Sequence, residues 1–218
     1  MITFLAEHWL DIVTTVLGLA YILLEYKASV WMWLVGFLMQ ALGIVLYYQK
    51  GLYADCGMEF YYLAMTLYGW WRWVRPRGCG GTEVRRNENT TGSDISRTTE
   101  PPHLRTSDIH HFPQKLILPW LLIIAAIWVF IYWLLVTFTN SNVPLADSFT
   151  TALSIVGIWA LAHKYLEQWF IWIAVDVVTS VLYFYKDIPF KASLYALYVI
   201  IAIAGWFKWR KMMKVKNE

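Results

Sequence analysis

Charged side chains are scarce in this chain. Asp, Glu, Lys and Arg make up only 15% of its 218 residues, whereas a soluble domain carries about 25%. Hydrophobic residues reach 59%, above the level of about 45–50% in soluble domains. This composition excludes an ordinary soluble catalytic domain and indicates a protein of the lipid bilayer.

The sequence also lacks the features of a disulfide-rich protein, of a secreted protein and of a nucleotide-driven pump. The chain has two cysteines, Cys56 and Cys79, so a disulfide framework is excluded and two lone thiols are expected. The first basic residue is Lys27, and no small-x-small cleavage site follows the first apolar stretch, so no signal peptide is expected. No G-x-x-x-x-G-K-[ST] sequence is present, so nothing indicates ATP hydrolysis.

Long apolar blocks fill most of the sequence instead. A run of about 18 or more mostly apolar residues is typical of a transmembrane helix. The predicted spans cover residues 5–24, 28–48, 54–74, 116–138, 146–162, 168–185 and 192–209. Glu7, His8 and Asp11 weaken the first span, and the fifth is short. We therefore expect an all-α integral membrane protein with seven transmembrane helices.

Lys and Arg residues are divided unevenly between the two sides of such a bundle. Three of the 18, namely Lys50, Lys186 and Lys191, fall on one side and fifteen on the other. Cytoplasmic loops hold most Lys and Arg of membrane proteins. We expect a multi-pass protein of the cell (inner) membrane with its N-terminus outside and its C-terminus in the cytoplasm. Without the weak first span, only the N-terminus would change sides.

The sequence contains an internal repeat. Gly-Trp-x-x-Trp occurs at residues 69–73 and again at 205–209, an offset of 136 that also aligns Trp33 with Trp169. The first three spans therefore repeat as the last three, and the span between them lets the second triplet start from the same side. We expect a 3+1+3 plan with parallel three-helix repeats, the plan of SWEET carriers, and a substrate bound between the halves.

This plan divides the chain into four parts. The first repeat is residues 1–74, the connecting helix is 116–138, and the second repeat with its basic tail is 139–218. Between them, residues 75–115 are rich in Gly, Pro, Ser and Thr with charges of both signs, which is typical of a flexible linker and would be cytoplasmic. The linker contains His103, His110 and His111 without the spacing of a closed metal site. No metal and no cofactor are therefore expected.

Polar and aromatic side chains recur on one face of two spans. In the sixth span, Trp172, Asp176 and Tyr183 follow Trp169 by 3, 7 and 14 residues. In the third span, Tyr62, Trp70 and Trp73 follow Glu59 by 3, 11 and 14 residues. Such spacings place side chains on one helical face. Gln40 and Tyr198 are the repeat mates of Asp176 and Tyr62. We predict that these ten residues bind a small substrate.

The predicted cavity suits a flat, cationic and hydroxylated solute. An ionisable group within the membrane costs about 2.5–3.5 kcal/mol on insertion scales and faces protein or water by default. Trp and Tyr rings bind cations with about 0.5–2 kcal/mol per contact. Two alternatives remain open. In the first, Asp176 and Glu59 form hydrogen bonds with neighbouring helices and have no ligand. In the second, tryptophans such as Trp70 and Trp73 serve only to anchor the chain at the membrane interface.

Two stretches carry a resemblance to a known family. "GLYADCGMEFYYLAMTLYGWWRWVR" and "EQWFIWIAVDVVTSVLYFYKDIPFKASLYALYVIIAIAGWFKWRK" resemble the Pnu family of vitamin transporters, most of all its nicotinamide riboside transporters. The resemblance covers nearly the whole chain outside residues 75–115. It implies a 3+1+3 fold, one vitamin precursor bound between the halves, and facilitated diffusion followed by trapping through a cytoplasmic kinase. We therefore expect a protein that is not an enzyme. We also expect it to associate with membrane lipid and with further copies of itself.

The family motif falls here on Trp172 and Asp176, with Glu59, Tyr62, Trp70 and Trp73 on the third span. Similar nicotinamide riboside carriers often have an amide near the positions of Glu59 or Asp176, so two carboxylates leave thiamine open as the substrate. Two other classes stay open from the residues alone. A SWEET-like sugar carrier would not need the two carboxylates, and a membrane enzyme would need more acid–base or metal-binding groups around them.

The charge asymmetry generates a topology prediction. A reporter fused after Glu218 should be active only in its cytoplasmic form, and a cysteine introduced near Asp187 should react with an impermeant reagent from outside. The control is a cysteine within the 75–115 linker, which should stay unlabelled in intact cells. Labelling of that cysteine from outside would contradict the orientation.

Overall fold

The computed structural model describes residues 2–49, 53–75, 109–139, 143–185 and 189–215. Within these ranges the chain is helical almost throughout. The elements are α1 (Ile2–Tyr26), α2 (Trp31–Gln49), α3 (Tyr53–Val74), the short 3-10 helix η2 (Gln114–Leu116), α4 (Ile117–Phe138), α5 (Pro144–Ala162), α6 (Gln168–Tyr185) and α7 (Pro189–Val215). The all-α prediction is confirmed, and each predicted span corresponds to one of the α-helices.

The helices differ in how clearly they qualify as membrane spans. Among the described residues, four helices have the length and mean hydropathy to cross a bilayer, and these are α4, α5, α6 and α7. Within α1 and α2, residues 15–26 and 31–45 are apolar helical stretches among the residues whose side chains are described. In α3 the apolar character is diluted by Tyr, Trp and acidic side chains. Helix α7 extends to Val215, beyond the predicted end at 209.

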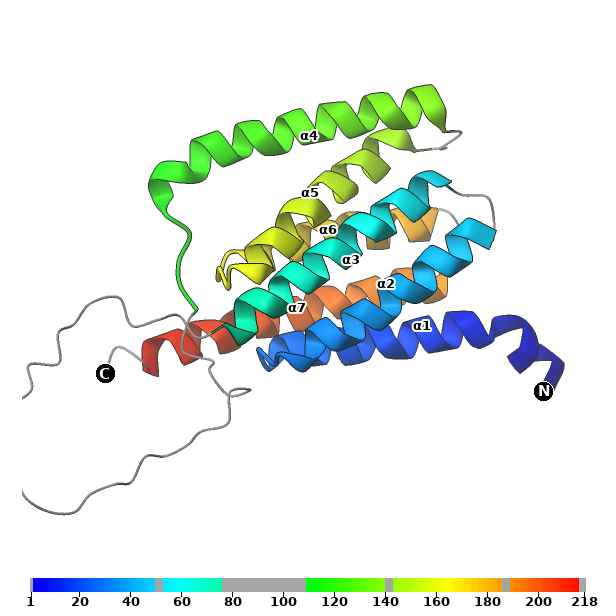
Figure 1. The fold of residues 1–218 in the computed structure, drawn as a ribbon, viewed down its shortest axis with the longest axis horizontal. Helices are drawn as coiled ribbons and strands as arrows, with labels where there is room; N and C mark the ends of the chain where they lie inside the picture. The colour runs from blue at the N-terminus through cyan, green and yellow to red at the C-terminus, as the bar shows by residue number, and fades with distance from the viewer. Residues whose placement is uncertain (1, 50–52, 76–108, 140–142, 186–188, 216–218) are drawn as a thin grey trace, which may run out of the picture.

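The helices form two groups with α4 at the edge (Figure 1). Helix α2 packs on α1 and α3, and α6 packs on α5 and α7. The groups join where α3 meets α5 and where α1 meets α7. Helices α1, α3, α5 and α7 run in one direction through the bundle (Figure 1). Helix α4 packs on α5 and has the highest mean hydropathy of the four candidate spans, 2.6, with 6% of its window buried.

The turns after α1 and α5 have the same backbone geometry. Ala28 has a φ of 50° and Lys164, 136 positions later, a φ of 58°. Both are left-handed, which is uncommon for residues other than glycine and typical of the residue that ends a helix. In each turn the next residue donates its N–H to the carbonyl five positions earlier, at 2.9 Å after α1 and 3.1 Å after α5. The internal repeat therefore extends to the backbone.

Four buried indoles meet where the two groups of helices join. In the order Trp33, Trp73, Trp209 and Trp169, neighbouring ring centroids are 5.7, 6.4 and 5.6 Å apart. No member of this four-tryptophan cluster is more than 6% exposed. Trp73 donates its Nε1–H to the carbonyl of Ala162 in α5 at 3.2 Å. Trp209 donates to the carbonyl of Glu25 in α1 at 3.1 Å. Each half thus bonds the helix end of the other half.

Two glycines make room for this cluster. A Cβ atom on Gly69 would lie 2.2 Å from the ring of Trp33, and one on Gly205 would lie 2.5 Å from the ring of Trp169. Real Cβ atoms do not approach other atoms so closely, so any larger residue would displace a buried indole. The repeated Gly-Trp-x-x-Trp sequence is therefore a packing motif: its glycine admits one indole, and its last tryptophan contacts the same indole edge-on.

Residues 109–113 dock against the turn between α5 and α6. Ile109 is buried and packs on the hydrophobic core that contains the four-tryptophan cluster. His110 exchanges two backbone hydrogen bonds with the turn, of 3.3 and 3.1 Å, and Glu167 accepts the N–H of Phe112 at 2.9 Å. The last part of the predicted 75–115 linker is thus a docked segment, whereas residues 76–108 lie outside the described ranges.

The glycine contacts generate a stability prediction with a matched control. Gly69→Ala should destabilise the protein by about 1–3 kcal/mol, the range for overpacking a well-packed core, because the Trp33 ring must move. Gly57→Ala, on the same helix with nothing within 4 Å of its added Cβ, should be neutral or stabilise by about 0.5–1 kcal/mol. Thermal unfolding in detergent measures both. Equal melting temperatures for the two variants would contradict this packing role.

Candidate functional site

A cavity of about 870 Å³ lies between the two groups of helices. Its described wall comes from α1, α2, α3, α5, α6 and α7. The volume falls within the range of about 300–1,000 Å³ that is usual for small-molecule sites. Both halves of the repeat contribute to one cavity, as in transporters built from internal repeats.

Seven of the ten predicted binding residues line this cavity. They are Trp169, Trp172, Asp176 and Tyr183 on α6, Glu59 and Tyr62 on α3, and Tyr198 on α7. The helical face predicted from the α6 spacing is therefore the face that meets the cavity. Asp176 is 6% exposed and lies one turn beyond Trp172, whose ring would contact a Cβ on Gly157 at 3.3 Å. The absence of that Cβ lets the indole approach α5 closely.

Three predicted residues lie outside the cavity wall. Gln40 belongs to α2, which contributes only Met39 among its described residues, so the repeat mate of Asp176 does not face the cavity. Trp70 is 50% exposed on the surface of α3. Trp73 belongs to the four-tryptophan cluster, and the Lys164 ammonium lies over its ring at 4.5 Å. Periodicity placed these residues on the right helices, but it did not show where the cavity ends.

The wall also contains polar residues that were not selected from the sequence. Examples are Tyr21, Glu25, Thr150, Thr151, Ser154 and Tyr195. Glu25 directly follows the predicted end of the first span at residue 24. The structure places it inside, at 3% exposed, because α1 continues to Tyr26. A carboxyl group directly after an apolar block was the available signal.

Acidic groups outnumber basic groups around the cavity. Its described wall contains four carboxyl groups, those of Glu25, Glu59, Asp147 and Asp176, and one ammonium group, that of Lys191. The Lys191 nitrogen also lies 5.6 Å from the centroid of the Tyr183 ring. Buried carboxylates are costly unless a positive charge compensates them. The cavity therefore favours a cation.

Symmetry-related positions of the wall have diverged. Tyr62 of α3 forms a side-chain hydrogen bond with Ser154 of α5. Its mate, Tyr198 of α7, points its hydroxyl at Gly18 of α1, where an added Cβ would lie 2.7 Å away. Gly18 and Ser154 are themselves 136 positions apart. At equivalent positions, Tyr62 is thus hydrogen-bonded to a serine, whereas the Tyr198 hydroxyl lies against a glycine. The two sides of the cavity therefore differ, which suits a ligand whose two ends differ.

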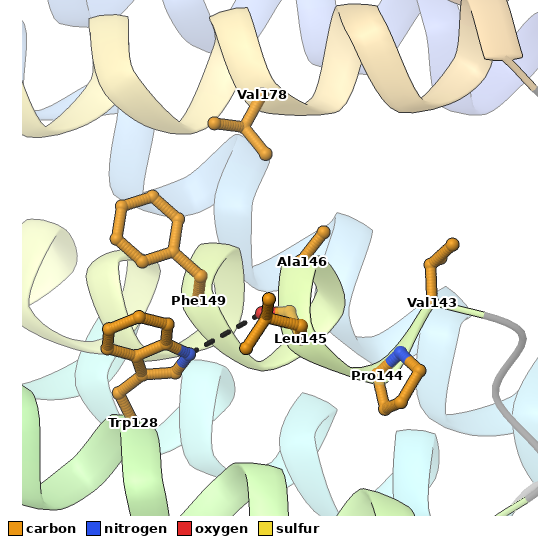
Figure 2. Close-up of a pocket in the computed structure, with 7 residues that line it drawn as sticks. All are labelled: Trp128, Val143, Pro144, Leu145, Ala146, Phe149 and Val178. Atoms are coloured by element: carbon orange, nitrogen blue, oxygen red, sulfur yellow. Dashed lines mark hydrogen bonds between the residues drawn. The ribbon is translucent and has the colours of Figure 1, made fainter.

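A smaller hollow between α4, α5 and α6 has a different character. Its volume is about 400 Å³, and Figure 2 shows the seven residues that line it, Trp128, Val143, Pro144, Leu145, Ala146, Phe149 and Val178. The Trp128 Nε1–H donates to the carbonyl of Leu145 at 3.4 Å and to the Ser148 hydroxyl at 3.1 Å. No titratable side chain lines it. The hollow lies where α4 packs on α5, and it contains no charged group that could bind a charged solute.

A family model described as nicotinamide mononucleotide transporter matches residues 8–211. The chain belongs to this family. It is therefore a member of a family of transporters, which are not enzymes, and a multi-pass membrane protein. The resemblance to the Pnu vitamin transporters is confirmed.

Individual relatives are distant but cover most of the chain. The riboflavin/roseoflavin transporter RibM of Streptomyces davaonensis is 25% identical over 207 residues, covering 92% of this chain and 84% of RibM. The nicotinamide riboside transporter PnuC of Escherichia coli is 22% identical over 225 residues, with the same two coverages. A crystal structure of the vitamin B3 transporter PnuC aligns with a TM-score of 0.66 and 23% identity over 98% of this chain and 86% of that one. At this identity the structural likeness shows the fold.

The placement of the tryptophans generates a binding prediction. Trp172→Ala should weaken the binding of a transported vitamin by about tenfold or more, since about 1.4 kcal/mol of lost ring stacking corresponds to that factor. Trp172→Phe should lose less because it keeps part of the stacking surface. Trp70→Ala removes an equal ring outside the cavity and should leave the Kd within about twofold. Isothermal titration of the purified variants measures this, and equal losses in both alanine variants would contradict the assignment.

Proposed function

We propose that this chain carries nicotinamide riboside into the cell by facilitated diffusion and that the acidic, aromatic cavity is its binding site. The observation that carries the proposal is the excess of carboxyl groups over ammonium groups in a cavity walled by Trp and Tyr. Nicotinamide riboside combines a flat pyridinium ring of fixed positive charge with a ribose. The ring suits aromatic stacking and the hydroxyls suit carboxylate acceptors.

Within this proposal the side chains have separate roles. The Trp172 indole stacks on the cationic ring, and Asp176, one turn away, compensates its charge or accepts a ribose hydroxyl. Tyr62 and Tyr198 contribute hydroxyls from the two symmetry-related helices. Glu59 adds a second carboxyl from α3. The family membership and the relatives named for nicotinamide riboside support this reading.

The proposed transport mode follows a 3+1+3 plan of parallel repeats. The turn geometry at Ala28 and Lys164 and the paired glycine contacts, both repeated after 136 positions, support this plan. Alternating access would then rock one half against the other around the fixed site. In the inner membrane, with the C-terminus cytoplasmic, net uptake would come from a cytoplasmic kinase that phosphorylates the substrate, because a facilitator alone only equilibrates it. Association of several copies of the chain is part of the same expectation.

Thiamine is the second candidate, and one observation favours it. The position one turn beyond Trp172 carries a carboxylate, and the cavity holds further carboxyl groups, including Glu25 and Glu59. Thiamine is also a cation, and its aminopyrimidine ring pairs well with a carboxylate. Riboflavin, named for the relative RibM, lacks a fixed positive charge and would leave these carboxyl groups uncompensated.

Proteoliposomes provide the test. Labelled nicotinamide riboside should equilibrate in both directions without ATP or an ion gradient, because the chain has no nucleotide-binding motif. Unlabelled thiamine and riboflavin, added separately as competitors, rank the alternative substrates. Stronger competition by thiamine than by unlabelled nicotinamide riboside would reassign the substrate. Accumulation above the outside concentration that an ionophore abolishes would contradict facilitated diffusion.

A further inference from the structure

A hollow of about 630 Å³ lies between α4, α5 and α6, beside the docked residues 109–113. It is separate from the smaller apolar hollow around Trp128. Three of its apolar lining residues, Ile117, Leu121 and Phe170, are about half exposed, so the hollow opens onto the outer surface of the bundle. Helix α4 forms part of this surface, with 6% of its apolar window buried. The opening therefore faces the lipid of the bilayer.

Helix α5 separates this hollow from the central cavity. Val156 and Ala160 line the hollow, whereas Thr150 and Thr151 line the cavity. With about 3.6 residues per turn, these two pairs fall on opposite sides of α5. A ligand in the hollow would thus not overlap a vitamin in the cavity, so what the hollow binds does not depend on which vitamin is transported.

Aromatic rings line the hollow next to the docked segment. The ring centroids of Trp120 on α4 and Trp159 on α5 are 4.2 Å apart at an interplanar angle of 33°. The ring of Phe112 lies edge-on to Trp120 at 6.2 Å and to Tyr165 at 5.1 Å. Such a group of Trp and Tyr rings at helix ends is typical of the level where lipid headgroups begin.

The depth of the hollow matches one leaflet. On α4 its lining extends from Ile117 to Ile124, which corresponds to about 10 Å at 1.5 Å per residue. Half of a bilayer core of about 30 Å is about 15 Å. The hollow thus begins at the helix ends and stops before the middle of the membrane, as a site for a single acyl chain would.

Polar groups gather at the rim of the hollow, where residues 109–113 meet the turn between α5 and α6. The Glu167 carboxylate bonds the His111 Nδ1 atom at 2.8 Å and accepts the N–H of Phe112 at 2.9 Å. A carboxylate has about four acceptor sites, and the Glu167 side chain is 37% exposed. It can therefore accept further N–H donors from a ligand. Lys115, in the adjoining helix η2, adds an exposed basic side chain at this end.

The hollow is therefore apolar along its length, aromatic near one end, and charged with both signs at that end. We propose that it binds one phospholipid with an amine headgroup from the adjacent leaflet. The acyl chain lies between α4 and α6, the ammonium group donates to Glu167, and the phosphate lies near Lys115. Because Glu167 also bonds residues 109–113, a bound lipid stabilises the docking of that segment and of α4 against the second half.

Thermal unfolding of delipidated full-length protein in mild detergent tests this site. Phosphatidylethanolamine, at about 100 times its Kd, should raise the melting temperature by about 5–10 °C. Phosphatidylcholine, whose ammonium has no N–H, and phosphatidylglycerol, which has no ammonium, should each give less than half of that shift. Native mass spectrometry should show one retained phosphatidylethanolamine per chain. Equal shifts with all three lipids would indicate unspecific solvation and would overturn the proposal.

Variants of the rim and of the mouth provide the controls. Glu167→Gln can still accept the N–H of Phe112 but loses the charge, so it should lose at least half of the phosphatidylethanolamine shift. Leu121→Trp places an indole at the mouth and should also reduce that shift. The matched control is Leu122→Trp, because Leu122 is 64% exposed on the same helix but lies outside the hollow, and it should keep the wild-type shift.

The readout is the shift caused by lipid, so a variant that only lowers the melting temperature in detergent does not imitate loss of the site. A wild-type shift in both Glu167→Gln and Leu121→Trp would overturn the proposal. If Leu121→Trp instead converts an oligomer to monomers in lipid-free detergent while Leu122→Trp does not, the hollow is an interface between copies of the chain and the lipid site is wrong.

Discussion

The architecture depends on two indoles inserted where a glycine has no side chain. Trp33 occupies the space over Gly69, and Trp169 occupies the space over Gly205. These contacts hold α2 on α3 and α6 on α7 at close range, since only a glycine lets a helix backbone approach an indole so closely. The last tryptophan of each repeated sequence then bonds the end of a helix from the other half. The same few residues thus close each half and join the two.

Such a symmetric scaffold leaves room for an asymmetric site. At equivalent positions one half has Glu25 where the other has Leu161, and Gln168 where the other has Met32. Of these positions, Glu25 lines the cavity, so the two halves differ in polarity there although they share the tryptophan and glycine contacts. Acidic groups within a membrane protein are costly, and the described wall of this one cavity contains four of them.

The helices and the face of α6 that meets the cavity were predictable from local patterns. Long apolar blocks produce helices whose ends lie close to the predicted ones, and the spacing of Trp172, Asp176 and Tyr183 identified the α6 face that meets the cavity. The same logic misplaced Trp73, because a stripe of aromatic residues continues past the cavity into the core. It also passed over Glu25, because hydropathy ends a span at the first charged residue even when the helix continues.

Periodicity along the sequence therefore determined the number of helices, their approximate limits and the existence of two related halves, because each follows from local hydrophobic spacing and from an offset of 136. Which side chains share the cavity was decided by the tertiary structure. The pairing of Tyr62 with Ser154, the place of Glu25 beside Gln168, and the burial of Trp73 all depend on contacts between helices far apart in the chain. A helical pattern gives the direction of a side chain around its own axis, but only packing decides what lies opposite it.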